Sequence, residues 1–512
     1  MNIAPSTPVI IGVGQSVDRI DSSSYKAWSA PDLAAAASAA AISDSQATGD
    51  ILRGIEMIAT TRTFEDSRPQ PAFFGKSSNF PRSITKRLGI NPPHAVWGKA
   101  GGNTPQDLVN EFCERIAERE FKLVLITGAE AISTVRHAHR QGLKLDFAED
   151  PGGQVEDRGS GLKELRDPAM GRYGLIDPSS VYAVAENARR SRLGQTREDY
   201  AKGMGDLFAP FAAIASVNPW SAWQVPAYTS EELISIDPHN RWIADPYPLR
   251  LVARDQVNLG AAVLLASYET ALRLGVPAER LVYLHGYAQA AEKPFSQRPD
   301  LGVSPASRQV AQRAMQCAGA MPAQIAAFDF YSCFPIAVAN VAIDEFGLSP
   351  HDPRGLSVTG GLPFFGGPGN NYSMHAIAEI VARVRKEKGR PGFVGANGGY
   401  LSKYSAGIYS TSPKPWQVCD SAPLQADLNA VKGIEILPAY EGQGVVESYT
   451  VQHEKGQPAK AIIVARTPDH RRFFACSAPG DLVTAGQAHE QDALHRTIRV
   501  HHENELNLFR FS

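Results

Sequence analysis

Short apolar runs alternate with amphipathic stretches over about the first 410 residues, a pattern typical of an α/β fold. One order of five elements occurs twice: a buried strand, a helix, a second strand, a helix with an apolar stripe, and a third strand. The first set is predicted at residues 8–13, 32–45, 55–59, 104–119 and 123–127, and the second at 281–284, 306–318, 325–330, 371–386 and 393–396. Corresponding elements lie about 270 residues apart, which favours a duplicated fold over the ordinary alternation of any α/β protein.

The segments outside the repeated elements, at 131–245 and after 415, predict a loop domain and a separate C-terminal domain. Residues 131–245 form a long excursion rich in polar and aromatic residues, and such an excursion is usually functional. We expect an N-terminal half at 1–275 that includes this loop domain, a C-terminal half at 276–415, and a linker at 416–430. From 431 to 512 short strands alternate with turn residues, which predicts a small OB-like β-barrel domain. Its clearest strands are predicted at 444–452, 461–466 and 472–477.

Composition narrows the class of protein. Lys and Arg number 51 against 53 Asp and Glu, a net charge of −2 that argues against nucleic acid as a partner. Hydrophobic residues make up 43% of the 512 residues, as in a globular enzyme, and no apolar run is long enough to span a membrane. There is no secretory signal pattern, and the five cysteines show no metal-site spacing. We therefore expect a reduced, cytoplasmic protein without a bound metal.

Glycine-rich loops precede the two corresponding helices 104–119 and 371–386. They occupy residues 98–103 and 360–371. A helix N-terminus exposes unpaired N–H groups that suit oxyanions and phosphates, and glycine lets a ligand approach the backbone. The alternative is helix capping with tight packing; a capping box is predicted at Thr104 with Asp107. Residues 394–400 end a strand in a Gly-Gly turn that also presents backbone N–H groups.

Cys333 is the most promising side chain for chemistry. It stands between the strand at 325–330 and an apolar helix predicted at 336–343, beside Tyr331. We expect the helix dipole to lower the pKa of the Cys333 thiol. The alternative is an inert core cysteine.

These loops, in this order on a duplicated chain, resemble the thiolase superfamily over about residues 7–410, and the sterol-carrier-protein-type thiolases most closely. Segments 128–131, 245–247 and 255–267 are also similar to their counterparts. With the added β domain, the whole chain resembles thiolase-like proteins of type 1. The resemblance implies two βαβαβαββ halves in a five-layered αβαβα arrangement. It also implies coenzyme A or acyl-CoA as substrate or ligand, with no covalently bound cofactor.

The chain departs from the thiolase motifs at four places. Residues 99–103 lack the nucleophilic cysteine that the family carries just before this helix, and Cys113 lies about two turns further on. The histidine of Gly-His-Pro falls on Gly367, and the cysteine of Cys-x-Gly-Gly falls on Ala396. The His-Asp-Cys-Phe motif reads Tyr-Ser-Cys-Phe at 331–334. Because covalent catalysis needs an activated nucleophile, ordinary thiolysis is not expected.

The resemblance assigns roles to three groups of residues. The catalytic candidates are Cys333, which matches the acid/base cysteine of sterol-carrier-type thiolases, and Tyr331. The backbone donors expected to polarise a thioester oxygen are Gly102, Asn103 and Gly398. The residues of the expected substrate loop are Gly366, Gly367, Pro368, Asn370 and Asn371.

The leading hypothesis is an acyltransferase-like protein that binds acyl-CoA and acts at the thioester α-carbon without a cysteine-bound intermediate. The alternatives are a thiolase-fold aldolase or side-chain lyase, motivated by Tyr331, and a non-catalytic CoA-ester binding protein. We expect residues 131–245 to cover the pantetheine arm. Arg189, Arg190 and Arg192 are candidates to meet the phosphates, or form a solvated helix surface. The family favours a homo-oligomer, but the extra domain would leave a monomer if it blocks the dimer face.

Overall fold

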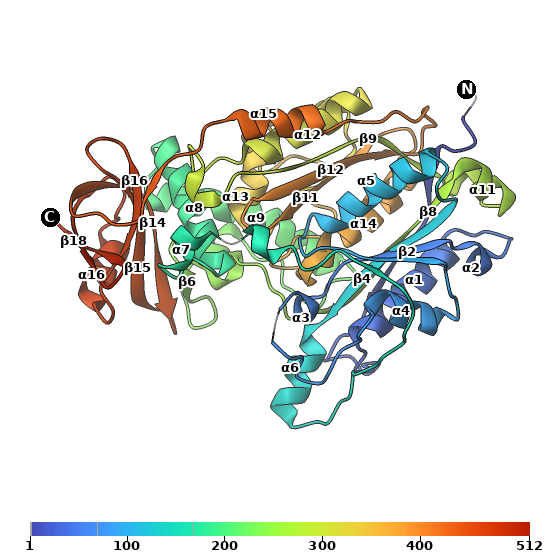
Figure 1. Cartoon of the computed structure of the whole chain (residues 1–512), viewed down its shortest axis with the longest axis horizontal. Helices are drawn as coiled ribbons and strands as arrows, with labels where there is room; N and C mark the ends of the chain where they lie inside the picture. The colour runs from blue at the N-terminus through green and yellow to red at the C-terminus, as the bar shows by residue number, and fades with distance from the viewer. Residues whose placement is uncertain (1–2, 69, 166) are drawn as a thin grey trace.

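A ten-stranded sheet runs through both halves of the chain in the computed structural model, which describes residues 3–68, 70–165 and 167–512 (Figure 1). The strand order is β10-β11-β12-β9-β1-β8-β4-β2-β3-β5. The strands of the first half are β1 (Pro8–Val17), β2 (Met57–Thr60), β3 (His94–Trp97), β4 (Leu123–Ala131), β5 (Glu156–Asp157) and β8 (Asn258–Ser267). Those of the second half are β9 (Val282–Ala291), β10 (Ala327–Asp329), β11 (Gly392–Gly398) and β12 (Lys403–Ser410).

The two halves meet where β1 pairs with β9. The pairing is short, with Val9 opposite Tyr283 and Ile10 opposite Val282. Outward from this junction, the order β1-β8-β4-β2 repeats as β9-β12-β11-β10. The strands predicted as equivalent therefore hold equivalent places, and the duplicated fold is confirmed.

Helices form the other layers. At the centre, α5 (Thr104–Ala117) packs against α14 (Tyr372–Lys386), and both contact strands of either half. Helix α1 (Ala30–Asp44) covers the outer face of the first half, and α12 (Pro305–Ala318) covers that of the second. Helix and sheet layers thus alternate as the thiolase resemblance implied. The smaller helices of the core are α2 (Ile51–Gly54), α3 (Phe64–Ser67), α4 (Phe80–Leu88), α11 (Tyr268–Arg273) and α13 (Pro335–Val338).

Helix α1 begins two residues before its predicted start because Ser29 caps it. The Ser29 hydroxyl accepts from the N–H of Asp32, and the Asp32 carboxylate accepts from the N–H of Ser29. The capping box predicted at Thr104 and Asp107 is wrong. Asn103 is the N-cap of α5 without a side-chain cap, and the Asp107 carboxylate accepts from the Asn103 amide.

The loop domain is mostly helical. Its long helices α8 (Pro178–Leu193) and α9 (Arg197–Val217) pack their buried faces onto the second half of the core. The smaller elements are α6 (Ile132–Gln141), α7 (Pro168–Gly171), α10 (Ser230–Ile234), β6 (Trp242–Ala244) and β7 (Tyr247–Pro248). The predicted linker is not fully extended, since its second part forms α15 (Ala422–Ala430), which contacts α12 and β9.

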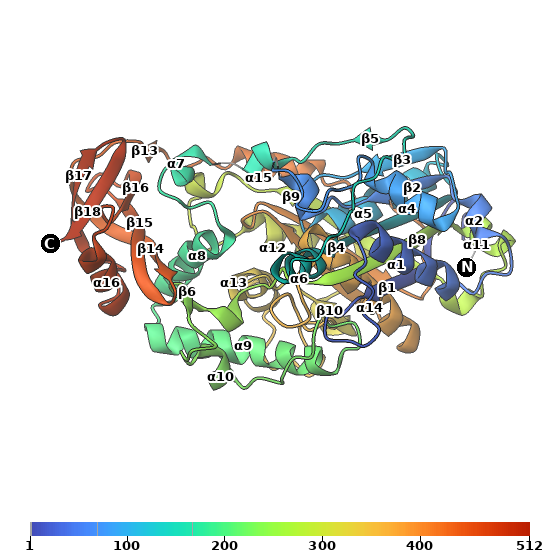
Figure 2. The same ribbon diagram turned by 90° about the horizontal axis from the view of Figure 1, so that it is seen from below.

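The C-terminal region is a closed five-stranded barrel, as expected from the sequence. Its strands pair in the order β14-β15-β16-β18-β17-β14 and enclose a core of their own. The barrel strands are β14 (Gly442–Glu454), β15 (Gln457–Arg466), β16 (Arg472–Cys476), β17 (Thr497–Glu503) and β18 (Leu506–Phe511). The short strand β13 (Ile436–Leu437) pairs with β16, and helix α16 (Leu482–Glu490) connects β16 to β17. Figures 1 and 2 show the barrel at the opposite end of the molecule from α2 and α11.

Polar groups fix the barrel to the loop domain. Strand β14 pairs with β6, where Gln452 lies opposite Ala244. The buried Arg190 of α8 donates to both oxygens of Asp492, at 2.7 and 2.8 Å. The Ser448 hydroxyl donates to the carbonyl of Val184 at 2.6 Å. The barrel is therefore held by contacts along α8 and not by its covalent linker alone. Among the described helices, none has the length and apolarity needed to cross a membrane.

Arg190→Ala should lower the free energy of unfolding by about 2–3 kcal/mol, because Asp492 would remain partly buried without its cation. Urea unfolding followed by circular dichroism measures this. The control is Arg53→Ala, whose ion pair with Asp50 is exposed and should contribute less than about 1 kcal/mol. Equal effects of the two substitutions would show that the Arg190 pair does not stabilise the docked barrel.

Candidate functional site

A cavity of about 460 Å³ lies between the two glycine-rich loops and the loop domain. The structure brings five of the predicted site residues to its wall: Gly102, Tyr331, Cys333, Gly367 and Asn370. Two others pack behind the wall, since a Cβ on Gly398 would lie 2.0 Å from the side-chain oxygen of Asn103. The cavity residues that sequence reasoning missed include Tyr182 of α8 and Asn397 of β11.

The substrate loop is held partly by structural hydrogen bonds. Asn370 accepts from the N–H of Gly101 at 2.8 Å. Asn371 donates to the carbonyl of Gly128 at 2.7 Å, so it fixes α14 to β4 instead of lining the cavity. Gly366 and Pro368 also lie outside the cavity lining, and only Gly367 and Asn370 of the predicted set reach it.

The Tyr331 hydroxyl fills the space at the start of α5. A Cβ on Gly102 would lie 2.1 Å from this hydroxyl and 2.5 Å from the carbonyl oxygen of Asn397. Both distances are shorter than a van der Waals contact allows, so only glycine fits. Tyr331, which stands where the family motif has a histidine, therefore lies beside the start of α5. The thiolase motif has its nucleophilic cysteine just before this helix.

Cys333 is a neutral thiol at this site. The Asn397 amide donates to its sulfur at 3.8 Å and to the Tyr182 hydroxyl at 2.7 Å. Burial raises the pKa of Cys333 to about 12 and raises the pKa of Tyr331 further above its usual value. The prediction that a helix dipole lowers the pKa of this thiol is wrong, because desolvation outweighs any effect of the helical segment at 335–343 that follows it. Both groups can donate a proton, and neither is an anionic nucleophile at neutral pH.

A buried carboxyl group stands behind the start of α5. Asp107 accepts from the Asn103 amide and from the Ser405 hydroxyl of β12, and burial raises its pKa to about 6. It positions Asn103, the N-cap of α5. A capping role was predicted for this residue from its spacing, and its contact with Ser405 arises only because α5 packs on β12.

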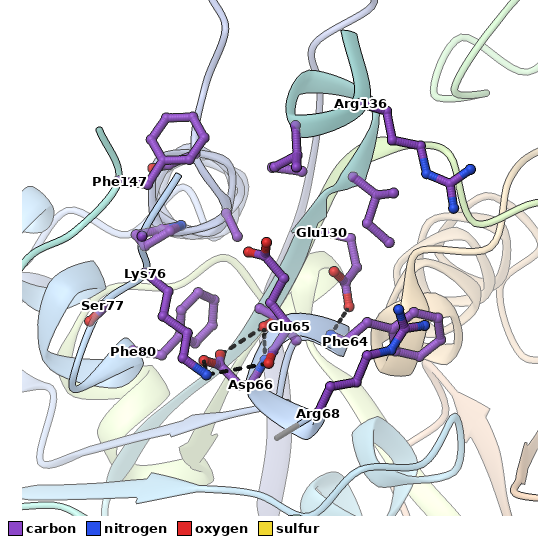
Figure 3. A pocket seen from close by; sticks show the side chains of 18 of the residues that line it. Phe64, Glu65, Asp66, Arg68, Lys76, Ser77, Phe80, Glu130, Arg136 and Phe147 are labelled. Atoms are coloured by element: carbon purple, nitrogen blue, oxygen red, sulfur yellow. Dashed lines mark hydrogen bonds and ion pairs between the residues drawn. The ribbon is translucent and has the colours of Figure 1, made fainter. Parts of the chain in front are cut away.

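Figure 3 shows a second cavity, of about 180 Å³. It adjoins the first cavity, since Phe64, Arg68 and Asp255 line both. Its wall mixes acidic with basic side chains. Glu130 accepts from the N–H of Phe64 at 2.7 Å, and burial raises its pKa well above the usual value. Lys76 pairs with Asp66 at 3.3 Å. Among the described residues, no group of three or more His, Cys, Asp or Glu side chains could hold a metal ion.

The three arginines proposed to meet phosphates are engaged elsewhere. Arg189 pairs with Asp344 at 2.6 Å, and Arg190 pairs with Asp492. Arg192 contacts Asp344 at 3.2 Å. The prediction is therefore wrong for the buried Arg190 and is not supported for the other two. Helix α8 instead contributes Tyr182 to the cavity.

The duplicated sheet, the paired central helices and the cavity between their glycine loops define a member of the thiolase superfamily. The chain is 40% identical to the monomeric SCP2-thiolase like protein type 1 from Mycobacterium smegmatis, with a TM-score of 0.84 over 100% of both chains. The family model of the thiolase-like protein type 1 additional C-terminal domain matches residues 423–505. The chain therefore belongs to the SCP2-thiolase-like protein type 1 family.

More distant structures share the fold. The Ltp2–ChsH2(DUF35) aldolase is 20% identical with a TM-score of 0.58, over 81% of this chain and 100% of that one. The dimeric peroxisomal thiolase of Saccharomyces cerevisiae is 15% identical with a TM-score of 0.56, over 80% of this chain and 99% of that one. A search of curated proteins finds no match.

Gly102→Ala should lower the free energy of unfolding by about 1–3 kcal/mol, because the new methyl group would displace Tyr331 or the backbone at Asn397. The matched control is Gly203→Ala in α9, where a Cβ would meet nothing within 4 Å and should not destabilise the protein. Thermal unfolding of both variants measures the difference. A Gly102→Ala protein as stable as the wild type would mean that the contact is not tight.

Proposed function

We propose that this protein binds an acyl-CoA in the 460 Å³ cavity and promotes enolate formation at the thioester α-carbon without a covalent acyl-enzyme, with the carboxylate of Asp255 on the same cavity wall as the base that takes the α-proton. The observation that carries the proposal is the Tyr331 hydroxyl against Gly102 at the N-terminus of α5. A helix N-terminus presents N–H groups to a developing oxyanion, and a neutral hydroxyl beside it can donate a proton. Cys333, held by Asn397 on the same cavity wall, is the second proton donor.

Loss of the nucleophile removes thiolysis but leaves enolate stabilisation. An oxyanion donor typically contributes about 3–4 kcal/mol to transition-state stabilisation, and a general acid or base about 10²–10⁴-fold in rate. Together with a base that takes the α-proton, the remaining groups therefore support reactions that pass through a thioester enolate. The loop-domain residues Pro178, Ser179 and Tyr182 line the cavity, which supports a role of this domain in covering the pantetheine arm. The adjoining 180 Å³ cavity offers space for the distal part of the acyl group.

Aldol-type carbon–carbon cleavage is the second candidate, favoured by the neutral state of both Tyr331 and Cys333. In this reaction the β-hydroxyl group of the substrate loses its proton and the Cα–Cβ bond breaks. A carbonyl compound leaves, and the thioester enolate takes a proton at its α-carbon. The proton lost equals the proton gained, so a tyrosine or thiol that relays it is sufficient and no nucleophile is needed.

Tyr331→Phe should reduce turnover about 10²–10⁴-fold while acyl-CoA binding is retained, because only the hydroxyl is lost. The assays are α-proton exchange of acyl-CoA in D₂O and cleavage of β-hydroxyacyl-CoA, with calorimetric titration for binding. Tyr440→Phe in the barrel is the control, since its hydroxyl contacts the carbonyl of Gln443 far from the cavity.

The outcomes separate the candidate functions. Exchange without cleavage supports enolate chemistry alone, and cleavage supports the aldolase. Binding without either reaction would identify a CoA-ester carrier and overturn the catalytic proposal. Because the Cys333 pKa is about 12, neither rate should show a thiol ionisation between pH 6 and 9.

We also propose that the protein is a monomer, as the Mycobacterium smegmatis relative is described. Strand β5 of the same chain pairs with β3, with Val96 opposite Glu156 and Trp97 opposite Asp157, so this edge of the sheet is covered. Light scattering should give a mass of about 55.2 kDa. A mass twice as large would contradict the proposal.

A further inference from the structure

Two cysteines that are distant in the sequence lie together on the outer side of the second half. Cys317 is the penultimate residue of α12 and is half-buried, and Cys419 is buried in the segment that leads to α15. Both pack at the same apolar cluster, their thiols influence each other's ionisation, and both are free. The Cys419 thiol donates to the carbonyl of Gln417 at 3.8 Å. Neither residue lines the cavities described above.

The segment that carries Cys419 is fastened across the end of α12. Lys414 donates to the carbonyl groups of Cys317 and Ala318 at 3.0 and 2.9 Å. The N–H of Cys419 donates to the Tyr287 hydroxyl at 3.2 Å, and Trp416 stacks on the Tyr287 ring with centroids 5.5 Å apart. These contacts hold the two thiols together without a covalent bond.

The surroundings favour a thiolate on Cys317. The neighbouring Cys419 side chain and the positive charges of Arg313 and Lys414 lower the pKa of Cys317 to about 7, although partial burial opposes this. In contrast, burial raises the pKa of Cys333 to about 12. The thiolate is the reactive form of cysteine, and Cys317 is also accessible to small oxidants.

We propose that Cys317 and Cys419 form a reversible oxidation site, in which a hydroperoxide converts the two thiols into a disulfide. The Cys317 thiolate attacks one oxygen of hydrogen peroxide, the O–O bond breaks, and Cys317 becomes a sulfenic acid as water forms. The Cys419 sulfur then attacks the Cys317 sulfur, and the sulfenic oxygen leaves as a second water. The two thiols lose two electrons and two protons in total, and one peroxide is reduced to two waters.

The disulfide would tie α12 to the segment that leads through α15 to the barrel. It would thus fix covalently a connection that Lys414, Tyr287 and Trp416 now hold through non-covalent contacts. This site is independent of the proposed acyl-CoA chemistry.

The test treats the full-length reduced protein with a small excess of hydrogen peroxide and counts free thiols after denaturation. The count should fall from five to three, with a mass loss of about 2 Da and a linked peptide pair containing Cys317 and Cys419. Dithiothreitol should restore five thiols. Iodoacetamide at pH 7.5 should label Cys317 at least about tenfold faster than Cys333.

Matched variants identify the pair. Cys317→Ser and Cys419→Ser should each abolish the mass loss, whereas Cys476→Ser, in the barrel, should retain it. Substitution of the buried Cys419 can impair folding. Loss of the disulfide in Cys317→Ser, at a half-buried position, is therefore sufficient to identify the pair. Five thiols after peroxide treatment, a disulfide between other cysteines, or accumulation of a Cys317 sulfinic acid without a disulfide would overturn the proposal.

Discussion

The contact between α5 and α14 at the centre of the molecule holds the two glycine-rich loops together, and the cavity depends on it. The Asn370 side chain accepts from the N–H of Gly101 at 2.8 Å, and the Ser373 hydroxyl donates to the carbonyl of Gly102 at 2.5 Å. Both hydrogen bonds are buried and join the first half of the chain to the second. Loss of either would leave a buried polar group unpaired, so the duplicated core and the geometry of the cavity stabilise one another.

Burial decides the protonation state of the cavity. The thiol of Cys333 and the hydroxyl of Tyr331 have raised pKa values because the surrounding protein does not solvate their anions. A thiolase needs an anionic nucleophile, and this cavity holds neutral proton donors in its place. At Cys317 the balance is reversed, because the thiol is half-buried and lies beside Cys419 and near cations. Residue type alone therefore does not distinguish the two cysteines.

Helix α8 links the cavity to the barrel. Tyr182 lines the cavity, while Val184 and Arg190 contact the barrel through Ser448 and Asp492. The barrel thus rests on the same helix that forms part of the cavity wall. A displacement of the barrel would disturb α8, so the additional domain has a structural role in this protein.

The duplicated α/β fold, the added barrel and the glycine loops could be predicted from the amino-acid pattern, because hydrophobic periodicity and turn residues act locally. Motif order also singled out Tyr331 and Cys333 as catalytic candidates, and the structure places both on the cavity wall. The folded arrangement decides their ionisation, since desolvation depends on what packs around a group. It likewise decided that Arg190 pairs with Asp492 and that Asn397 reaches Cys333. These contacts join residues far apart in the chain, and no local pattern records which distant side chain will lie beside another.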